Sequence, residues 1–180
     1  FNRKYKLTKI YIFCFSLLFS SLVYSSNVAV IDINFIIDNS RHFKEISEKI
    51  NESQLSFIDE FKKIEQNLNK KKEELENSKF VLNDDEFNLK KDEYYNEVSN
   101  FENDVSVFNS HYEKQIINVK NILFKKITEL IQTYASANQI DLILEKNQYL
   151  IAADKINISE IIFIQLNEEI IELTFDKYEN

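Results

Sequence analysis

The sequence predicts an α+β fold in which a small body, with three strands per chain, carries a long antiparallel helical hairpin. Three observations predict it. Apolar residues repeat at coiled-coil spacing through two long stretches, a helix-start signal near Asn83 separates the two stretches, and short apolar runs typical of strands lie on either side of them. The 180-residue chain has no Gly and no Pro, so its turns must be found from capping residues instead.

The two arms of the hairpin show a heptad seam in which steps of four and three residues alternate. In the first arm the seam positions are Ile50, Gln54, Phe57, Phe61, Ile64, Leu68, Lys71, Leu75, Ser78 and Leu82. In the second arm they are Phe87, Lys91, Tyr94, Val98, Phe101, Val105, Phe108, Tyr112, Gln115 and Val119. Beyond Val119 the apolar arc widens, which predicts that this end of the second arm enters a core.

The turn between the arms has a capping box, in which Asn83 caps the second helix and Glu86 stands three residues later. Leu82 and Phe87 occupy the positions of a hydrophobic staple. Asp84, Asp85 and Glu86 place negative charge at the positive end of the helix dipole. We therefore expect the arm to span residues 43–136, with its tip near residue 83.

Residues 1–25 have the pattern of a secretory signal peptide: four basic residues precede an apolar run, Ile10–Val23, too short for a typical spanning helix. We place cleavage after Ser25; the alternative is an uncleaved membrane anchor. Cys14, the one cysteine, lies inside the segment that would be removed. Cleavage would leave 18 basic and 30 acidic residues, a formal charge of −12, which argues against nucleic acid as a partner.

The body is predicted from the two segments that flank the arm, residues 26–42 and 137–180. The first holds a strand, Val28–Ile31, then a short helix to Asn39 and a break at Ser40–His42. The second holds a β-hairpin, with strands at 140–144 and 149–152, and a final helix that starts at a capping box, Asn157–Glu160, and carries Ile162, Leu166, Ile170 and Leu173.

Three strands from one chain are too few to form a well-closed sheet, and a two-helix arm has no third partner to pack on. Both considerations predict an oligomer whose body is assembled from several chains. The residues that we expect to form this oligomerisation body are Val28, Val30, Ile31, Leu142, Ile143, Leu144, Leu150 and Ile151.

No catalytic, metal-binding or cofactor-binding constellation is recognisable in the sequence. The two histidines, His42 and His111, lie far apart along the chain, the predicted mature chain has no cysteine, and no Gly-rich phosphate loop is possible. We therefore predict that the protein is not an enzyme.

Several apolar side chains of the arm lie off the seam, and these are candidates for binding unfolded protein through weak, dispersed contacts. They are Leu55, Ile58, Phe80, Val81, Leu89, Tyr95 and Val107. The alternative interpretation is that they pack on a neighbouring subunit or are isolated exposed residues.

The two body segments resemble those of the Skp/OmpH family of periplasmic chaperones. Val28–Asn34 is similar to the family's opening strand and Asp-x-Asn turn. Gln139–Lys146, Leu150–Ala153 and Asp154–Asn167 are similar to its C-terminal block. The resemblance implies a periplasmic homotrimer with a β-barrel body and three helical arms around a cavity. It also implies ATP-independent binding of unfolded outer-membrane proteins, which prevents their aggregation.

The chain departs from familiar members of that family in its charge. Many members have positive arm tips suited to lipopolysaccharide, whereas this tip carries Asp84, Asp85 and Glu86 against Lys79, which argues against lipopolysaccharide binding. The alternative function is a structural coiled-coil protein of the cell envelope that binds one fixed partner through its arm tips.

Overall fold

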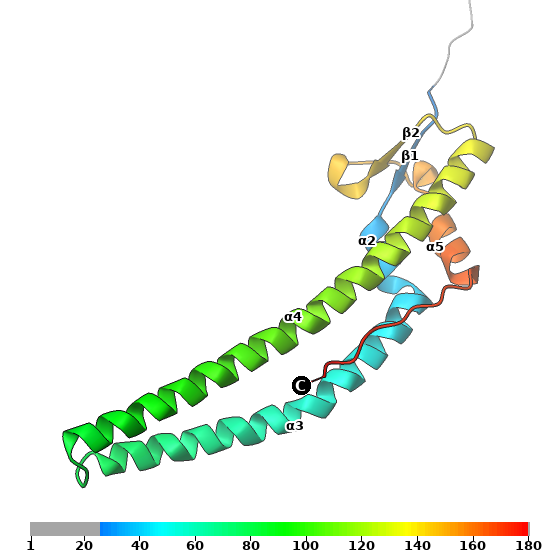
Figure 1. Cartoon of the computed structure of the whole chain (residues 1–180). Helices are drawn as coiled ribbons and strands as arrows, with labels where there is room; N and C mark the ends of the chain where they lie inside the picture. The colour runs from blue at the N-terminus through cyan, green and yellow to red at the C-terminus, as the bar shows by residue number, and fades with distance from the viewer. Residues whose placement is uncertain (1–25, 180) are drawn as a thin grey trace, which may run out of the picture.

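The computed structural model describes residues 26–179 as a small body from which a long helical arm projects (Figure 1). The predicted signal peptide, with Cys14, lies outside the described residues. The elements are β1 (Val28–Ile31), α2 (Ile33–Asn39), α3 (Arg41–Ser78), α4 (Asp84–Ala137), β2 (Leu142–Glu145), two short 3-10 turns (Lys146–Gln148 and Asp154–Ile156) and α5 (Ser159–Glu168). Within residues 26–179, no helix is both long and apolar enough to cross a bilayer.

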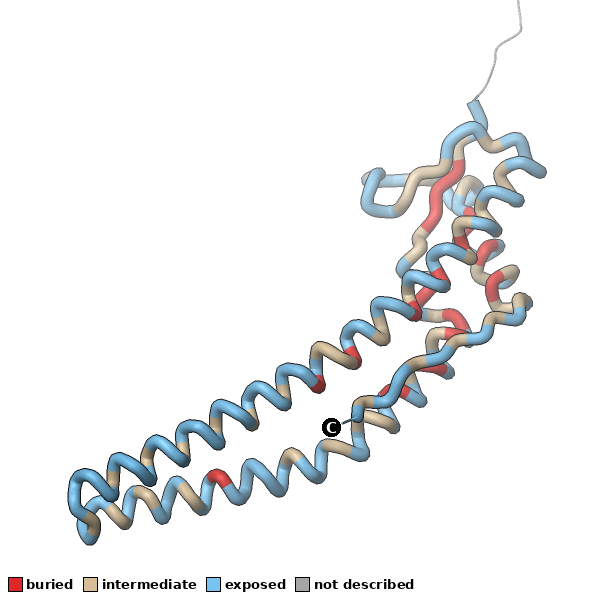
Figure 2. The backbone as a smooth tube through the Cα atoms, viewed as in Figure 1, coloured by how far each residue is buried: buried red, intermediate tan, exposed pale blue. Residues whose placement is uncertain are grey.

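The two helices of the arm are α3 and α4, which contain 38 and 54 residues and so extend for about 57 Å and about 81 Å. The predicted seam is confirmed: all ten second-arm positions are buried or half-buried, and in the first arm only Ile64 is exposed. At the tip, Asn83 Oδ1 accepts a hydrogen bond from the Glu86 N–H at 2.9 Å, as expected of the cap. Figure 2 shows that the buried residues concentrate in the body and the adjoining part of the arm.

The sheet joins the two body segments, as expected, but it has two strands and not three. β1 pairs in parallel with β2, with Val28 opposite Leu142 and Ile31 opposite Glu145. Between β1 and β2 the chain runs through α2, α3 and α4 (Figure 1). Val30 also forms an isolated bridge with Asn157.

The predicted β-hairpin is wrong. Residues 146–148 form a 3-10 turn, and residues 149–153 have no regular structure. A two-residue hairpin loop of the favoured type I′ needs positive φ at both residues, and within the described chain only Gln139 has positive φ. Instead the Gln148 side chain accepts a hydrogen bond from the Glu145 N–H at 3.0 Å, and Lys146 Nζ lies 2.6 Å from Asp32 Oδ2.

The core of the body lies where α2 and α5 pack against the C-terminal half of α4. Its fully buried side chains include Ile36, Leu123, Ile127, Ile162 and Leu166. This arrangement confirms that α4 enters a core beyond Val119. The break before α3 is also confirmed: Ser40 ends α2, and its Oγ accepts a hydrogen bond from the Phe43 N–H at 3.1 Å.

The start and the end of α5 both differ from expectation. The helix begins at Ser159 without a side-chain cap, because Asn157 Oδ1 accepts from the N–H and the hydroxyl of Ser159 at 2.9 and 2.6 Å and so forms an Asx turn. The helix ends at Glu168, so Ile170 and Leu173 are not helical. Residues 169–179, called the tail from here on, are extended and run back along α3 (Figure 1).

Candidate functional site

An aromatic cluster joins α3 and α4 at the middle of the arm. Phe61 lies 5.0 Å from Phe108 and 6.0 Å from Phe101, both edge-to-face, and Phe57 lies 5.6 Å from Phe108, measured between ring centroids. These are favourable geometries for aromatic pairs. The cluster forms because the seam brings a Phe of one helix opposite a Phe of the other.

An open groove of about 520 Å³ lies beside this cluster. The residues that line it include Ile58 and Phe61 of α3 and Phe101, Val105 and Phe108 of α4, with Gln54, Lys62, Glu65 and Asn109 at its polar edges. Half-exposed aromatic and aliphatic walls with polar edges suit an apolar side chain on a flexible chain. The groove therefore offers a place where an extended segment could bury alternate residues.

The tail occupies the arm at the body-proximal side of this groove. Its apolar residues Ile171, Leu173, Phe175 and Tyr178 are half-buried against the core, while the residues between them are exposed. From Ile171 to Asp176 the tail thus has the two-residue periodicity of a strand that lies on an apolar surface, and Tyr178 comes one residue later than this periodicity requires.

Side chains of α4 hold the backbone of the tail by hydrogen bonds. The ring Nε2 of His111 donates to the carbonyl oxygen of Asp176 at 2.8 Å. The Asp176 N–H donates to Gln115 Oε1 at 3.2 Å, and the Tyr178 N–H lies 3.5 Å from Tyr112 Oη. These bonds involve main-chain groups of the tail, so they could form with any extended segment.

The ring of Tyr178 sits among aromatic rings from both helices of the arm. Its centroid is 5.4 Å from Phe57, 5.2 Å from Phe108 and 5.6 Å from His111, with interplanar angles of 81°, 86° and 69°. Phe108 also lines the groove described above. The docked tail and the open groove are therefore two parts of one aromatic surface.

The off-seam residues predicted to bind unfolded protein are all exposed, but the structure does not gather them into one patch. Ile58 lines the groove, whereas Leu55 lies in a separate hollow with Phe43. Phe80 and Val81, 89% and 83% exposed, lie at the tip, and Leu89, Tyr95 and Val107 are distributed along α4. Their dispersal suits several weak contacts rather than one pocket.

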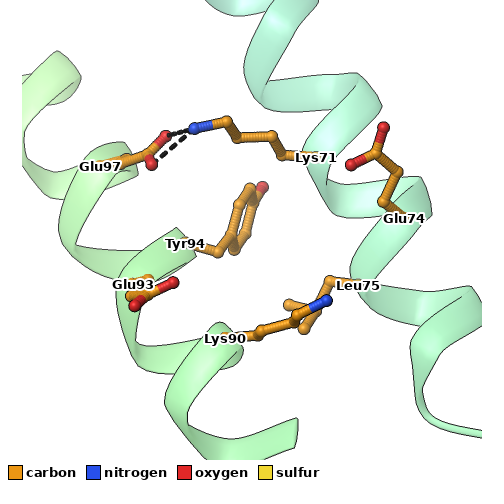
Figure 3. A pocket seen from close by; sticks show the side chains of 7 residues that line it. All are labelled: Lys71, Glu74, Leu75, Lys90, Glu93, Tyr94 and Glu97. Atoms are coloured by element: carbon orange, nitrogen blue, oxygen red, sulfur yellow. Dashed lines mark hydrogen bonds and ion pairs between the residues drawn. The ribbon is translucent and has the colours of Figure 1, made fainter. Parts of the chain in front are cut away.

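The hollow nearest the tip is bordered by charged residues, and Figure 3 shows its lining. Lys71 Nζ pairs with both carboxylate oxygens of Glu97 at 2.6 Å and so links the two helices. Tyr94 and Leu75 line the hollow below this pair (Figure 3). Because both charged side chains are more than a third exposed, the pair contributes little to stability and acts mainly on the register of the arms.

The residues expected to form the oligomerisation body fall into two groups. Val30 and Ile31 are buried within the chain, and Val28, Ile143 and Leu144 are half-buried. Leu142, Leu150 and Ile151 are exposed on a single chain, the last two almost completely. The body therefore has an uncovered apolar edge next to its small sheet.

The histidines have structural partners. His42 is 7% exposed, and its Nε2 lies 3.0 Å from the carbonyl oxygen of Leu166, which ties α3 to α5. His111 holds the tail. Within residues 26–179, no group of three or more His, Cys, Asp or Glu side chains could hold a metal ion.

Sequence reasoning missed the tail and the His111, Gln115 and Tyr178 contacts that hold it. A signal was present, because Ile171, Leu173 and Phe175 alternate with Glu172, Thr174 and Asp176. The spacing of Ile162, Leu166, Ile170 and Leu173 indicates a helix over an overlapping stretch. Both periodicities overlap at Leu173, and a single sequence does not separate them.

Fold and surface together define a class of protein: a helical-hairpin arm with an aromatic surface, carried on a small α+β body. The family model for outer membrane protein (OmpH-like) matches residues 27–166. The chain belongs to the OmpH-like family, as its resemblance to Skp/OmpH proteins predicted.

A solved structure agrees with this assignment at the level of the fold. It is a candidate outer membrane chaperone (OmpH-like) from Caulobacter crescentus, 13% identical, with a TM-score of 0.67 over 87% of this chain and 92% of that chain. A search of curated proteins found no match.

Proposed function

We propose that this protein is an ATP-independent periplasmic holdase chaperone, a homotrimer that binds unfolded outer-membrane β-barrel proteins and prevents their aggregation. Membership in the OmpH-like family supports a chaperone role rather than an enzymatic one. The observation that carries the proposal is the arm, which presents an open aromatic groove and dispersed apolar side chains far from the body. Such a surface can hold an extended apolar segment without demanding one shape.

The uncovered edge of the body supports the oligomeric part of the proposal. A two-stranded sheet with exposed Leu142, Leu150 and Ile151 beside it is too small to be stable by itself and gains stability when strands of other chains cover it. Several arms projecting from one body would surround a bound chain, and each would add weak contacts. Release then needs no nucleotide, because weak contacts exchange quickly with a folding partner.

The test is light scattering of a urea-unfolded outer-membrane β-barrel protein diluted into buffer, with and without this protein. We expect suppression of aggregation in the absence of ATP, at a stoichiometry of one client to one oligomer. The matched variants are Phe101→Ser, in the groove, and Asn100→Ser, beside it and exposed. The first should weaken suppression and the second should leave it unchanged; unaltered aggregation with the wild-type protein would refute the proposal.

The exposed tip favours a second candidate function, a structural envelope protein with one fixed partner. Phe80 and Val81 are the most exposed of the off-seam arm residues, and a single complementary partner could cover them. If aggregation is unaffected while a Phe80→Ser, Val81→Ser variant loses one defined binding partner, this second function replaces the first.

A further inference from the structure

The tail continues beyond the part of the chain that defines the family. The family model ends at residue 166, and the tail comprises residues 169–179. It leaves the body at Glu169, whose carboxylate pairs with Lys126 Nζ at 3.0 Å, and follows α3 toward the middle of the arm (Figure 1). Within residues 26–179, the fully buried core contains no residue of the tail, whose apolar side chains are only half-buried where they pack against it.

The contacts of the tail are those expected of a bound segment rather than of a packed core element. Its backbone is held by side chains, at Asp176 and Tyr178, and its side chains alternate between half-buried and exposed as far as Asp176. Tyr178 anchors the far end among Phe57, Phe108 and His111. The segment that occupies this site thus combines an extended backbone, alternate apolar residues and an aromatic anchor.

These features are also those of a transmembrane β-strand. Strands of outer-membrane barrels alternate apolar and polar residues and place aromatic residues at their ends. The sequence Ile171–Asp176 has the same alternation, and an aromatic residue, Tyr178, follows after Lys177. A strand segment of an unfolded barrel protein could therefore form the same main-chain hydrogen bonds with His111 and Gln115 and place an aromatic ring between Phe57 and Phe108.

We propose that the site formed by Phe57, Phe108, His111, Tyr112 and Gln115 is a binding site for strand segments of unfolded outer-membrane proteins, and that the tail is its resident occupant, displaced when a client binds. This inference rests on the proposed holdase function and assigns it a specific site. The tail covers the apolar site while the arm is empty, and it is tethered, so a client must outcompete a high local concentration. If the tail is docked nine-tenths of the time, its removal strengthens apparent client binding about tenfold.

The experiment uses a labelled peptide with the tail's own sequence, residues 169–180, as the probe. Its binding is measured by fluorescence anisotropy to the full chain and to a chain that ends at Glu168. We expect the shortened chain to bind the peptide about tenfold more tightly, and a urea-unfolded barrel protein to displace it. Equal binding to both chains, or peptide that the barrel protein does not displace, would overturn the inference.

A point variant covers the possibility that the shortened chain fails to fold. The chain has no Trp, so Tyr178→Trp introduces a single reporter at the anchor position. Excess unlabelled, Trp-free tail peptide should shift its emission to the red as the resident tail is displaced, and Phe108→Ser should produce that shift without peptide. The control is Thr174→Trp, at an exposed tail position, whose emission should stay unchanged. If peptide never shifts the emission of the Tyr178→Trp variant, the tail is a permanent structural strap and the inference is wrong.

Failure of this inference and failure of the holdase proposal give different results. If the tail is only structural, the full chain still suppresses aggregation, but the barrel protein and the peptide do not compete. If the holdase proposal fails, aggregation is unchanged with the full chain and with the shortened chain alike.

Discussion

Asp32, directly after β1, connects this strand to α2, to Lys146 after β2 and to the start of α5. Its Oδ1 accepts from the Phe35 N–H at 2.9 Å and caps α2, and its Oδ2 lies 2.6 Å from Lys146 Nζ, just after β2. Its own N–H donates to Ser159 Oγ at 2.8 Å, at the start of α5. Burial raises the pKa of Asp32, but the hydrogen bonds from Lys146 and from Phe35 outweigh burial, so its pKa lies below the ordinary value of 3.8.

Replacing Asp32 with Asn should destabilise the body in a pH-dependent way. Because the pKa of Asp32 is lowered by folding, its contribution to stability is fully present above the ordinary value of 3.8 and is lost as pH falls through the folded value. The hydrogen bond to Asp32 raises the pKa of Lys146 above 10.5, so the same pair weakens again in strong alkali. Urea unfolding should show Asp32→Asn less stable than wild type at pH 7, with the gap closing below about pH 3.8.

Two controls separate the charge pair from other effects. Lys146→Met should reproduce the pH dependence, because it removes the same pair and leaves the cap intact. Asp38→Asn breaks the exposed pair with Lys120 and should change stability little at any pH. A gap between wild type and Asp32→Asn that persists at pH 2 would show that the charge is not the cause.

Gln139 adopts the left-handed conformation that ends α4. Its φ is 53°, and the Ile140 N–H bonds to the carbonyl oxygen of Ala135 at 3.0 Å, as in a Schellman motif. Glycine usually takes this position because a Cβ atom is strained there, and the chain has no glycine.

Replacing Gln139 with Gly should therefore stabilise the protein, by about 1 kcal/mol in the free energy of unfolding. The side chain is exposed, so little packing is lost. Gln139→Ala, which keeps the Cβ atom, is the matched control and should bring no gain. Thermal unfolding of the three proteins side by side gives the comparison, and equal gains from Gly and Ala would contradict the explanation by backbone strain.

Aromatic contacts along the seam between α3 and α4 are the main stabilising interactions of the arm. Phe108 is 5% exposed and contacts Phe57, Phe61, Tyr112 and the tail's Tyr178. Beyond Leu68, toward the tip, the seam residues are only half-buried, and the pair Lys71–Glu97 replaces an apolar contact. Local stability should thus fall from the body toward the tip.

Phe108→Ala should open the arm without unfolding the body. Truncating a buried Phe costs about 3–5 kcal/mol, and here the loss falls on α3, α4 and the tail. Hydrogen exchange should show faster exchange in α4 around residues 100–115, with α5 still protected. Val107→Ala, next to it but 48% exposed, should change exchange little. Uniform acceleration that includes α5 would mean that arm and body unfold as one unit.

The two long helices of the arm were predictable because their sequence signals are long. The seam repeats over twenty positions, and the Asn83 cap marks the turn. A repeat of this length matches the period of a helix and cannot be mistaken for that of a strand. The segments after β2 are short, and Leu150–Ile151 reads equally well as a strand or as an exposed apolar loop. Whether such a segment pairs depends on partners that local sequence does not specify.

The candidate site was less predictable than the helices, for a related reason. Off-seam apolar residues such as Leu55 and Tyr95 are visible in the sequence, but their separation on the arm is not. The site around Tyr178 combines residues more than sixty positions apart, joined by His111 to Asp176 and by Gln115 to Asp176. Contacts at that separation follow from the path of the tail, which α5 sets by ending at Glu168.

The body and the arm both expose apolar residues, but these residues are arranged differently in the two parts. The body leaves Leu142, Leu150 and Ile151 exposed in and after β2 of its two-stranded sheet. The arm also exposes apolar residues, such as Leu55, Phe80 and Leu89, but these are dispersed along its two helices and its tip. We infer that the body is the part completed by other chains, while the arm remains open to a client.

Replacing both Leu142 and Ile143 with Asp should therefore give monomers. Carboxylates on β2 would be buried without partners in any sheet built from several chains, which costs far more than the assembly gains. Ile143 also packs partly into its own chain, so Leu142→Asp alone, at a half-exposed position, is the variant that leaves the fold intact. Light scattering should give the mass of one chain for both variants and of three for wild type.

The matched control places the same charge on the arm. Leu89→Asp changes a residue that is 66% exposed on α4, far from the body, and should leave the assembly at three chains. If the variants at Leu142 remain assembled, the contact between chains does not depend on β2, and the prediction is wrong. Since each monomeric variant keeps its own arm and tail, it should still bind the labelled tail peptide weakly but lose most suppression of aggregation, because holding a whole unfolded protein requires several arms at once.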